Sequence, residues 1–434
     1  MSTQEVHDRK EDALEIIRVA SEILNMGYVC DRCLGRAFSK LLYGKTNEER
    51  GKIIRDFIAL LLDSGVNINA RMENFQEYNF RRLEKIQSNK SECCVCENIF
   101  LEIIPKLVNE AIKKAKKYEF ETFLVGTVLN KTLHENDQTI LKISPNYSES
   151  IKDEINRILG KSISEKFNKS VDYSDPQLLI LVNLKKLKIE IKSKNLYIYG
   201  GYKKLVRGIP QTTWYCKRCR GKGCKNCNWK GKMYRSAVQQ IIEKPLIRMA
   251  KGKKSSFHGS GREDIDVRCL DYRPFVIEIV DPKIRNIDLN RAKIEINRSK
   301  YVQVSDLKFA SKEDIIAVKE AKNDKVYKAI VTFNKNLDKK ELEKLSNINN
   351  VRILQKTPIR VLHRRADLIR ERVVKRVEYK ILSKKRLELI IECDAGTYVK
   401  EFIHGDEGRT KPSIAEILQN KVKKIILDVI EIKK

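Results

Sequence analysis

The sequence has no apolar run long enough to cross a membrane. Apolar stretches such as residues 57–62 and 178–182 stop at five or six residues, whereas a membrane-spanning helix needs about 20. The N-terminal segment MSTQEVHDRKEDALEII has none of the uninterrupted apolar sequence of a signal peptide. We therefore expect a soluble, cytoplasmic protein without a membrane partner, and the sequence shows no sign of an obligate protein partner.

Histidines and nucleotide-binding motifs are also scarce. Five histidines in 434 residues disfavour a histidine-rich catalytic metal site. The segment YGKT at residues 43–46 is not a P-loop, because the position five residues before Gly44 is Ser39 rather than glycine. No G-x-G-x-x-G follows a predicted strand. These absences argue against ATP hydrolysis and against methyl or hydride transfer through such motifs.

Acidic residues are too few to balance the basic ones. The chain has 88 Lys and Arg against 58 Asp and Glu, a formal net charge of +30. Residues 201–262 contain seventeen basic residues and one acid, and residues 352–376 contain nine basic residues and two acids. An evenly spread excess would fit a lysine-rich protein with solvated charged faces. The clustering favours a nucleic-acid partner, because phosphate contacts dominate such binding.

Cysteines are present in closely spaced sets. A cytosolic protein keeps its thiols reduced, which disfavours disulfides, and each C-x-x-C turn delivers two thiolates to one zinc ion. A thioredoxin-like redox pair would need a βαβ context that the sequence lacks. We expect structural zinc at one or two four-cysteine sites and buried, unligated thiols at Cys94, Cys269 and Cys393. The predicted ligands are Cys30, Cys33, Cys93 and Cys96 for one site, and Cys216, Cys219, Cys224 and Cys227 for the other.

The hydrophobic spacing predicts an α+β, multidomain chain. Residues 1–200 form an α+β region, residues 201–235 a basic loop and cysteine knuckle, and residues 236–434 a mostly β region. The predicted helices are 12–27, 48–64, 98–117, 151–159 and 398–404. The predicted strands are 120–129, 139–143, 178–182, 187–191, 238–242, 275–280, 327–333, 387–392 and 424–432.

Two segments carry polar features that packing does not require. In FHGSGREDIDVRCLDYRPFVIEIV, residues 257–280, Asp264 and Arg262 stand on a glycine-bounded loop before a strand. A carboxylate presented there suits a nucleophile or a base, although an ordinary turn-capping aspartate has the same local pattern. In CDAGTYVKEFIHGDEGRTKPSIAEIL, residues 393–418, Thr397 can cap a helix that Tyr398 and Lys400 open.

Taken in order, the motifs resemble one enzyme family. The series GREDIDVR, RPFVIEI, KVYKAIV, TPIRVLHRRADLIRERVV and AGTYVKEFIHGDEGRTKPS resembles the tRNA pseudouridine synthase of archaea and eukaryotes that acts in the T-loop, at positions 54 and 55 in archaea. The segment YIYGGYKKLVRGIPQTTWYC and the N-terminal cysteine pairs resemble its accessory region, which contains a THUMP-type RNA-binding domain. The cysteine knuckle resembles the archaeal branch. The resemblance implies that residues 1–200 are the accessory RNA-binding region and that residues 236–434 are the catalytic domain, built on a mixed, mainly antiparallel sheet.

The resemblance implies a role for individual residues. Asp264 matches the catalytic aspartate that attacks a flipped uridine, and Tyr327 matches the tyrosine that stacks on the base and assists proton handling. Tyr398 matches a second substrate-contacting tyrosine, and Lys400 stands where related synthases place a basic partner of the aspartate. Arg262 stands where it could enter the base stack or hold a phosphate. The family's usual glycine-bearing stretch is absent at residues 270–273, which puts the entry to the following strand in doubt.

The implied reaction needs no organic cofactor, because converting uridine to pseudouridine is an isomerisation. The base must leave its stack, and the implied partner is the T-arm of tRNA. Whether the attack occurs at C1′ or at C6, and whether one or both T-loop uridines are modified, stays open. A non-catalytic tRNA-binding or chaperone protein and another THUMP-bearing tRNA-modifying enzyme are the alternatives, while a zinc deaminase lacks its H-x-E motif. The RNA-binding candidates are Lys203, Lys204, Arg207, Arg364 and Arg365.

Overall fold

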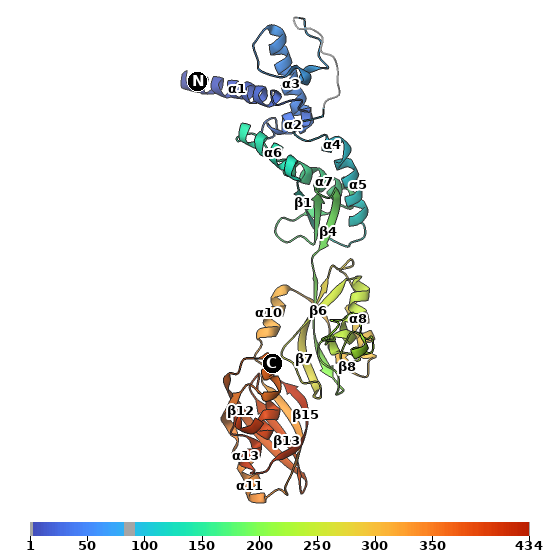
Figure 1. Cartoon of the computed structure of the whole chain (residues 1–434), viewed down its shortest axis with the longest axis vertical. Helices are drawn as coiled ribbons and strands as arrows, with labels where there is room; N and C mark the ends of the chain where they lie inside the picture. The colour runs from blue at the N-terminus through green and yellow to red at the C-terminus, as the bar shows by residue number, and fades with distance from the viewer. Residues whose placement is uncertain (1–2, 82–91, 434) are drawn as a thin grey trace. The chain divides into compact units, whose positions relative to one another are not determined.

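The computed structural model describes residues 3–81 and 92–433 (Figure 1). The chain divides into two compact units, Met1–Lys194 and Asn195–Lys434. In the parts of the chain that the structure describes, no helix is long and apolar enough to cross a membrane.

The first unit places helices on a small sheet. The helices are α1 (Thr3–Leu24), α2 (Asp31–Arg36), α3 (Asn47–Ser64), α4 (Ile99–Glu102), α5 (Ile104–Ala115), α6 (Lys131–Ile143) and α7 (Ile151–Phe167). The strands are β1 (Thr122–Val128), β2 (Ser170–Val171), β3 (Leu178–Asn183) and β4 (Lys188–Ser193), in the order β2-β1-β3-β4. Strand β1 is parallel to both neighbours, and β3 and β4 are antiparallel. The helices α5 and α7 share one apolar core with this sheet.

One strand prediction in this unit was wrong. Residues 139–143 form the end of helix α6. The Asn130 side chain caps that helix by accepting from the Leu133 N–H, and Leu133, Asp137 and Ile140 are all buried along one face. This helical spacing outweighs the short apolar pattern from which the strand was inferred.

The second unit contains one extended sheet with helices packed against it. Its helices are α8 (Val238–Ala250), α9 (Leu289–Asn297), α10 (Lys312–Glu320), α11 (Lys339–Glu343), α12 (Val399–His404) and α13 (Ile414–Ile417). Its strands are β5 (Leu196–Lys204), β6 (Lys254–Gly259), β7 (Arg268–Val280), β8 (Val302–Val304), β9 (Lys308–Ala310), β10 (Lys325–Phe333), β11 (Asn349–Lys356), β12 (Ile369–Ser383), β13 (Arg386–Cys393), β14 (Thr410–Lys411) and β15 (Val422–Ile432).

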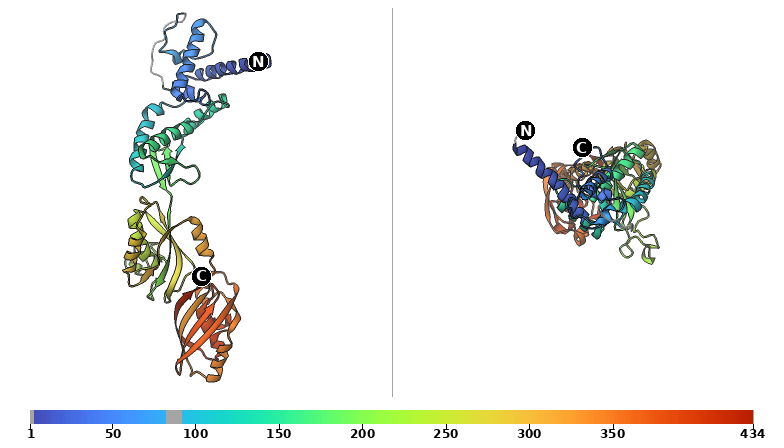
Figure 2. Two further views of the ribbon diagram at one scale, coloured as in Figure 1. Left: turned by 180° about the vertical axis from the view of Figure 1, so that it is seen from behind. Right: turned by 90° about the horizontal axis from the view of Figure 1, so that it is seen from above.

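The sheet of the second unit is mixed and mainly antiparallel, which confirms the predicted class. The strand order is β14-β11-β12-β13-β10-β15-β7-β5-β8, with β6 paired to β7 and β9 paired to β5. The β15–β7 pair is parallel, whereas the neighbouring β10–β15 and β5–β7 pairs are antiparallel. Two apolar clusters, one around β10 and β13 and one around β5 and β7, bury its faces. Figure 2 shows this sheet from behind.

Two further local predictions were wrong in this unit. Residues 238–242 begin helix α8, because Val238, Ile242 and Leu246 recur every four residues and are all buried. The segment predicted as a basic loop and knuckle, residues 201–235, begins inside strand β5, which runs to Lys204 and pairs with β7.

Candidate active site

A cleft of about 570 Å³ in the second unit brings together five residues that the sequence singled out. Its lining includes Arg262, Asp264, Tyr327, Tyr398 and Lys400. The loop between β6 and β7 carries the first two, β10 carries Tyr327, and the start of α12 carries the last two. These residues are as much as 138 positions apart in the chain, counting from 262 to 400, so it is the sheet that brings them together.

Asp264 presents its carboxylate between two cations. Its side chain is 35% exposed, and Oδ1 accepts a hydrogen bond of 3.1 Å from Nη1 of Arg360. Nζ of Lys400 lies 3.4 Å from the other carboxylate oxygen. The structure thus places both Lys400 and Arg360 beside the Asp264 carboxylate. Opposite charges at this distance hold the carboxylate in the cleft.

Lys400 also binds a second aspartate of the same loop. Its Nζ donates to both carboxylate oxygens of Asp266, at 2.7 and 2.8 Å. Partial burial raises the pKa of Asp266, but the hydrogen bonds and charge of Lys400 outweigh it and lower the pKa below the ordinary value. Lys400 therefore bridges the loop and α12, which fixes the ammonium beside Asp264.

Sequence reasoning missed the pair of Arg360 and Glu401. Nε of Arg360 donates to Oε1 of Glu401 at 2.6 Å, and the Glu401 side chain is 1% exposed. Burial alone would lower the pKa of Arg360, but the hydrogen bond and charge of Glu401, together with the charge of Asp264, raise it above the ordinary value. Arg360 therefore stays charged beside Asp264. The sequence signals were weak: Arg360 lies in the second basic stretch, and Glu401 follows Lys400.

A buried cluster anchors the Asp264 loop from within the unit. The Glu263 carboxylate accepts a hydrogen bond from the Tyr202 hydroxyl at 2.8 Å and pairs with Nε of Arg273 at 3.0 Å. Nη1 of Arg273 also donates to the carbonyl oxygen of Ser260, at 2.9 Å. All three side chains in these pairs are buried. Residues 270–273, where the family's glycine-bearing stretch is missing, lie within the continuous strand β7.

The structure contradicts the RNA-binding prediction for Lys204 and gives Arg207 several protein partners. Lys204 is fully buried, and its Nζ donates to the main-chain oxygens of Ile209 and Asp264, at 3.0 and 2.9 Å. Arg207 pairs with Asp428 at 2.5 Å and donates to two main-chain carbonyls. Lys204 therefore supports the loop from the interior and is not presented to phosphate, whereas Arg207 supports it from a partly exposed position.

The other RNA-binding candidates differ in position. Nζ of Lys203 lies 4.4 Å from the centre of the Tyr272 ring, a cation–π contact at the surface. Nη1 of Arg365 donates to the Tyr398 hydroxyl at 2.8 Å, and both residues line the cleft. The side chain of Arg364 lies outside the described part of the structure.

Tyr327 contributes an aromatic ring to the cleft wall. Desolvation by burial raises the pKa of its hydroxyl well above that of an ordinary tyrosine, with the positive charge of Arg273 opposing this. The phenol therefore keeps its proton across the physiological range, so it can donate a hydrogen bond to a bound base.

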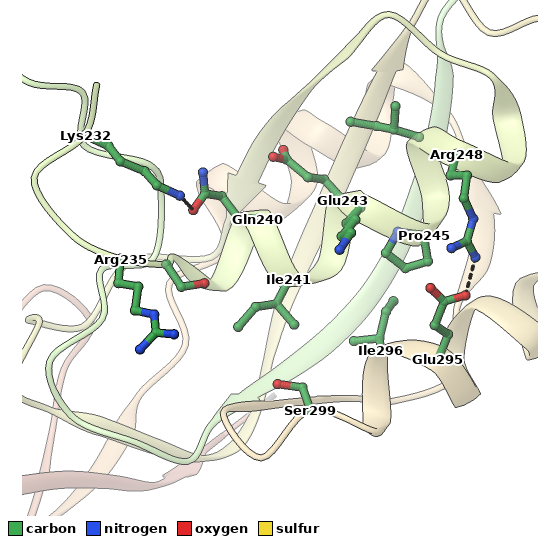
Figure 3. Close-up of a pocket in the computed structure, with 13 residues that line it drawn as sticks. Lys232, Arg235, Gln240, Ile241, Glu243, Pro245, Arg248, Glu295, Ile296 and Ser299 are labelled. Carbon is green, nitrogen blue, oxygen red and sulfur yellow. Dashed lines mark hydrogen bonds and ion pairs between the residues drawn. The ribbon is translucent and has the colours of Figure 1, made fainter. Parts of the chain in front are cut away.

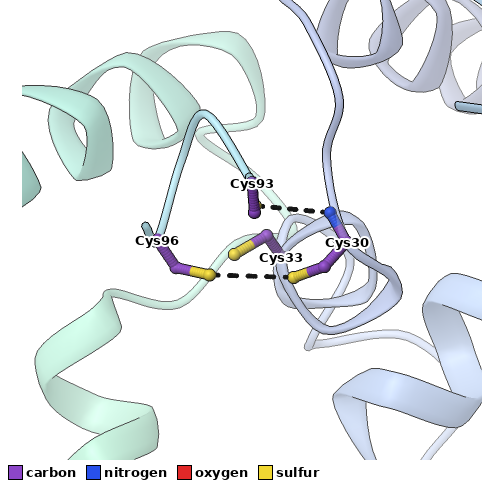
Figure 4. Close-up of side chains that lie close together, drawn as sticks. All are labelled: Cys30, Cys33, Cys93 and Cys96. Atoms are coloured by element: carbon purple, nitrogen blue, oxygen red, sulfur yellow. Dashed lines mark hydrogen bonds between the residues drawn. The ribbon is translucent and has the colours of Figure 1, made fainter. Parts of the chain in front are cut away.

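The two predicted cysteine sets form compact clusters that can hold a metal ion. Within each set, the sulfur atoms all lie within 4.8 Å of one another. Figure 4 shows the first set, in which the Sγ atoms of Cys30 and Cys96 are 3.8 Å apart. In the second set, the Sγ atoms of Cys216 and Cys224 are also 3.8 Å apart. Four sulfurs bound to one zinc at ~2.3 Å would lie about 3.8 Å apart, whereas a disulfide needs about 2.05 Å. The donor set therefore fits zinc.

Comparisons with known proteins show which family the chain resembles. The family model described as "Pus10, C-terminal" matches residues 197–433, and "Pus10 THUMP domain, archaeal" matches residues 107–183. A tRNA pseudouridine synthase Pus10 of Methanocaldococcus jannaschii is 41% identical over 435 residues, which cover 96% of this chain and 94% of that protein. The Pus10 of Methanothrix thermoacetophila is 38% identical over 432 residues, 97% and 95% of the two chains.

Among solved structures, a chain of a Cbf5-Nop10-Gar1 complex aligns with 54% of this chain and 48% of its own length, at 14% identity and a TM-score of 0.29. That likeness is too low to carry an argument. The sequence relatives and the two family models span both units, and on that evidence the chain belongs to the Pus10 family of tRNA pseudouridine synthases.

Proposed function

We propose that this enzyme isomerises uridine to pseudouridine in the T-loop of tRNA, at positions 54 and 55, with Asp264 as the nucleophile. The observation that carries the proposal is the Asp264 carboxylate, which faces a cleft between the cations of Arg360 and Lys400. A nucleophile for this reaction must be an ionised carboxylate that substrate can reach.

The chemistry conserves atoms and electrons. The bond from C1′ to N1 of the base breaks, C1′ joins C5, the proton on C5 leaves, and N1 gains a proton. Two routes begin this exchange: Asp264 attacks C1′ of the ribose, or it attacks C6 of the ring. In either route Tyr327 stacks on the flipped base, and its protonated hydroxyl can donate a hydrogen bond to that base. No organic cofactor is required.

The remaining parts of the chain support substrate binding. Tyr398, Arg262 and Arg365 contact the flipped nucleotide and its neighbouring phosphates at the mouth of the cleft, and Lys203 contacts the backbone. Residues 1–200 act as the accessory RNA-binding region, residues 201–235 as the basic loop and knuckle, and residues 236–434 as the catalytic domain. Both four-cysteine sites hold structural zinc, and the enzyme works in the cytoplasm.

The decisive experiment compares two aspartate variants. Asp264→Asn should abolish pseudouridine formation while retaining tRNA binding. Asp306→Asn, on an exposed carboxylate paired with Lys293, should behave as wild type. Carbodiimide treatment followed by primer extension maps the product in unmodified transcripts. Transcripts with one T-loop uridine replaced by cytidine show which uridine is modified. Equal activity in the two variants would overturn the role of Asp264, and product outside the T-loop would overturn the specificity.

A further inference from the structure

The cysteine knuckle, residues 215–235, has a charge that the folded protein does not balance. It contains eight basic residues and no acid. Within the described residues, no carboxylate forms an ion pair with any of them. Four thiolates and one zinc ion would carry a net charge of about −2, which offsets a quarter of the eight positive charges. The basic residues are Lys217, Arg218, Arg220, Lys222, Lys225, Lys230, Lys232 and Arg235.

The same knuckle exposes a large aromatic ring in an unusual backbone conformation. Trp229 is 71% exposed and has φ +60°. Its N–H donates to the carbonyl oxygen of Cys224 at 2.9 Å, which fixes the residue at the end of the cysteine turns. Bulky side chains rarely adopt this left-handed conformation, and strain of this kind gathers at functional positions. Burial in a core does not explain this tryptophan.

The base of the knuckle contacts the rim of the candidate active site. The N–H of Met233 donates to the carbonyl oxygen of Trp214 at 2.8 Å, which closes the knuckle. The Trp214 ring packs edge-on against Tyr234 at 5.6 Å. The guanidinium of Arg262 lies over the same ring, 5.3 Å from its centre. Arg262 lines the cleft that contains Asp264, so RNA bound on the knuckle would continue from RNA held at the cleft.

A neighbouring groove fits a polyanion less well. Residues of the knuckle end, α8 and α9 line a groove of about 710 Å³ (Figure 3). It contains two carboxylates, Glu243 and Glu295, and Glu295 pairs with Arg248. Lys232 is engaged by the Gln240 side chain at 3.0 Å. The groove sets these two carboxylates against its four cations, whereas the knuckle itself contains no acidic residue.

We propose that the knuckle is a second RNA-binding surface, on which Trp229 stacks with an unpaired base and the basic side chains hold the adjacent phosphates. Base–aromatic stacking combined with a cationic backbone track is how proteins grip unpaired nucleic acid. The inference rests on the proposed function in that the RNA is the tRNA substrate, held here outside the reacting nucleotide. The knuckle projects from the body of the second unit as a yellow-green loop, as the right-hand view of Figure 2 shows.

Fluorescence tests the stacking directly, because the chain has only two tryptophans. Trp214→Phe leaves Trp229 as the single tryptophan. Titration with an unmodified tRNA transcript and with a twelve-nucleotide oligouridylate should quench its emission. Saturating RNA that leaves this emission unchanged would overturn the proposal.

The affinity for tRNA shows how much the Trp229 ring contributes to the free energy of binding. Trp229→Asn removes the ring and keeps a residue type that tolerates positive φ, so zinc content and thermal unfolding should stay at wild-type values. The dissociation constant for the tRNA transcript should rise about 5- to 160-fold, the equivalent of ~1–3 kcal/mol for one stacked base. Trp229→Phe should retain most of the affinity. An unchanged dissociation constant in Trp229→Asn would refute the stacking role.

Salt dependence tests the charges. The paired substitution of Lys222 and Lys225 by Gln should lower the slope of log affinity against log salt by about 1.4, at ~0.7 for each lost contact to unpaired RNA. The same substitution of the exposed Lys339 and Lys340 on α11 is the matched control and should leave the slope unchanged. If the two double variants had equal salt slopes, the role of the knuckle in binding RNA phosphates would be contradicted.

Single-turnover rates separate this inference from the proposed function. At saturating enzyme, Trp229→Asn should form pseudouridine at close to the wild-type rate, because the Asp264 cleft is intact. If RNA did not quench the Trp229 emission while pseudouridine formation still depended fully on Asp264, only the proposed RNA-binding role of the knuckle would be overturned. Activity that survives in Asp264→Asn would overturn the proposed nucleophile and leave the knuckle result standing.

Discussion

Replacing Glu263 with Gln removes the carboxylate that anchors the Asp264 loop. Glu263 is fully buried, and so are its partners Arg273 and Lys204, whose nitrogens lie 3.0 and 3.8 Å from its two carboxylate oxygens. Gln can still accept from the Tyr202 hydroxyl, but it leaves two buried cations without a counter-charge. Removing one partner of a buried pair typically costs about 3–5 kcal/mol.

The structure places this substitution at the lower end of that range. Lys204 keeps its main-chain acceptors, among them the carbonyl oxygen of Asp264, and Arg273 keeps the Ser260 carbonyl. We therefore expect Glu263→Gln to lower the free energy of unfolding by about 3 kcal/mol. The loosened loop should also reduce the single-turnover rate, by up to about 100-fold, since small displacements of a reacting group are costly.

Urea unfolding, with the pseudouridine rate measured on the same preparations, checks this expectation. Glu371→Gln is the matched control, because Glu371 pairs with Arg352 at 3.0 Å on the surface, where the side chains are 54% and 79% exposed. An exposed pair of this kind contributes at most about 1 kcal/mol. If Glu263→Gln destabilised the protein no more than Glu371→Gln, the anchoring role of Glu263 would be refuted.

The loss of unfolding free energy caused by Glu263→Gln should also depend on pH, in a direction set by the pKa of Lys204. Burial lowers the pKa of Lys204 below the ordinary lysine value, although the charge of Glu263 opposes the shift. The folded chain therefore loses this proton at lower pH than the unfolded chain, so stability rises with pH across the interval between the two values. Removing the Glu263 charge lowers the folded-state pKa of Lys204 further. The destabilisation caused by Glu263→Gln should therefore narrow as pH rises toward the folded-state pKa of Lys204 in the wild type, because a neutral Lys204 needs no carboxylate.

Three further predictions follow from other contacts. Glu401→Gln should free Arg360 from its 2.6 Å hydrogen bond and reduce the single-turnover rate about tenfold (~1.4 kcal/mol), with tRNA affinity unchanged; a rate equal to wild type would contradict this. Burial raises the pKa of Asp428, but the hydrogen bond from Arg268 and nearby arginine charge lower it overall. Its stabilisation is therefore present above the ordinary aspartate pKa of about 4 and lost as pH falls through the depressed value. Asp428→Asn should accordingly show a shallower acid dependence in unfolding scans. Cys93→Ser should lower the zinc content by one ion per chain and reduce Tm, whereas Cys94→Ser should change neither.

The sequence by itself determined the features that depend on local spacing. Two cysteines with two residues between them lie on one turn and can reach one metal ion. Both four-cysteine clusters could therefore be predicted from the sequence, and the structure brings their sulfurs together. The long motifs around Asp264, Tyr327 and Tyr398 pointed to the family that the comparisons show. The α+β class followed from apolar periodicity, although residues 139–143 and 238–242 were assigned to strands because a five-residue apolar run does not distinguish the two periods.

Only the tertiary structure decided what each charged residue does. Arg360 and Glu401 are 41 positions apart, and Arg360 and Asp264 are 96 apart, and no local pattern records such contacts. In the sequence, Lys204 is one of several cations in a basic segment. In the structure, strand β5 places it in the interior, where its Nζ donates to main-chain carbonyl oxygens. The sequence shows the sign of each charge but not which way the side chain faces in the folded protein. The packing of strands decides whether a lysine faces RNA or the core, because burial of a cation is tolerated only where acceptors are already in place.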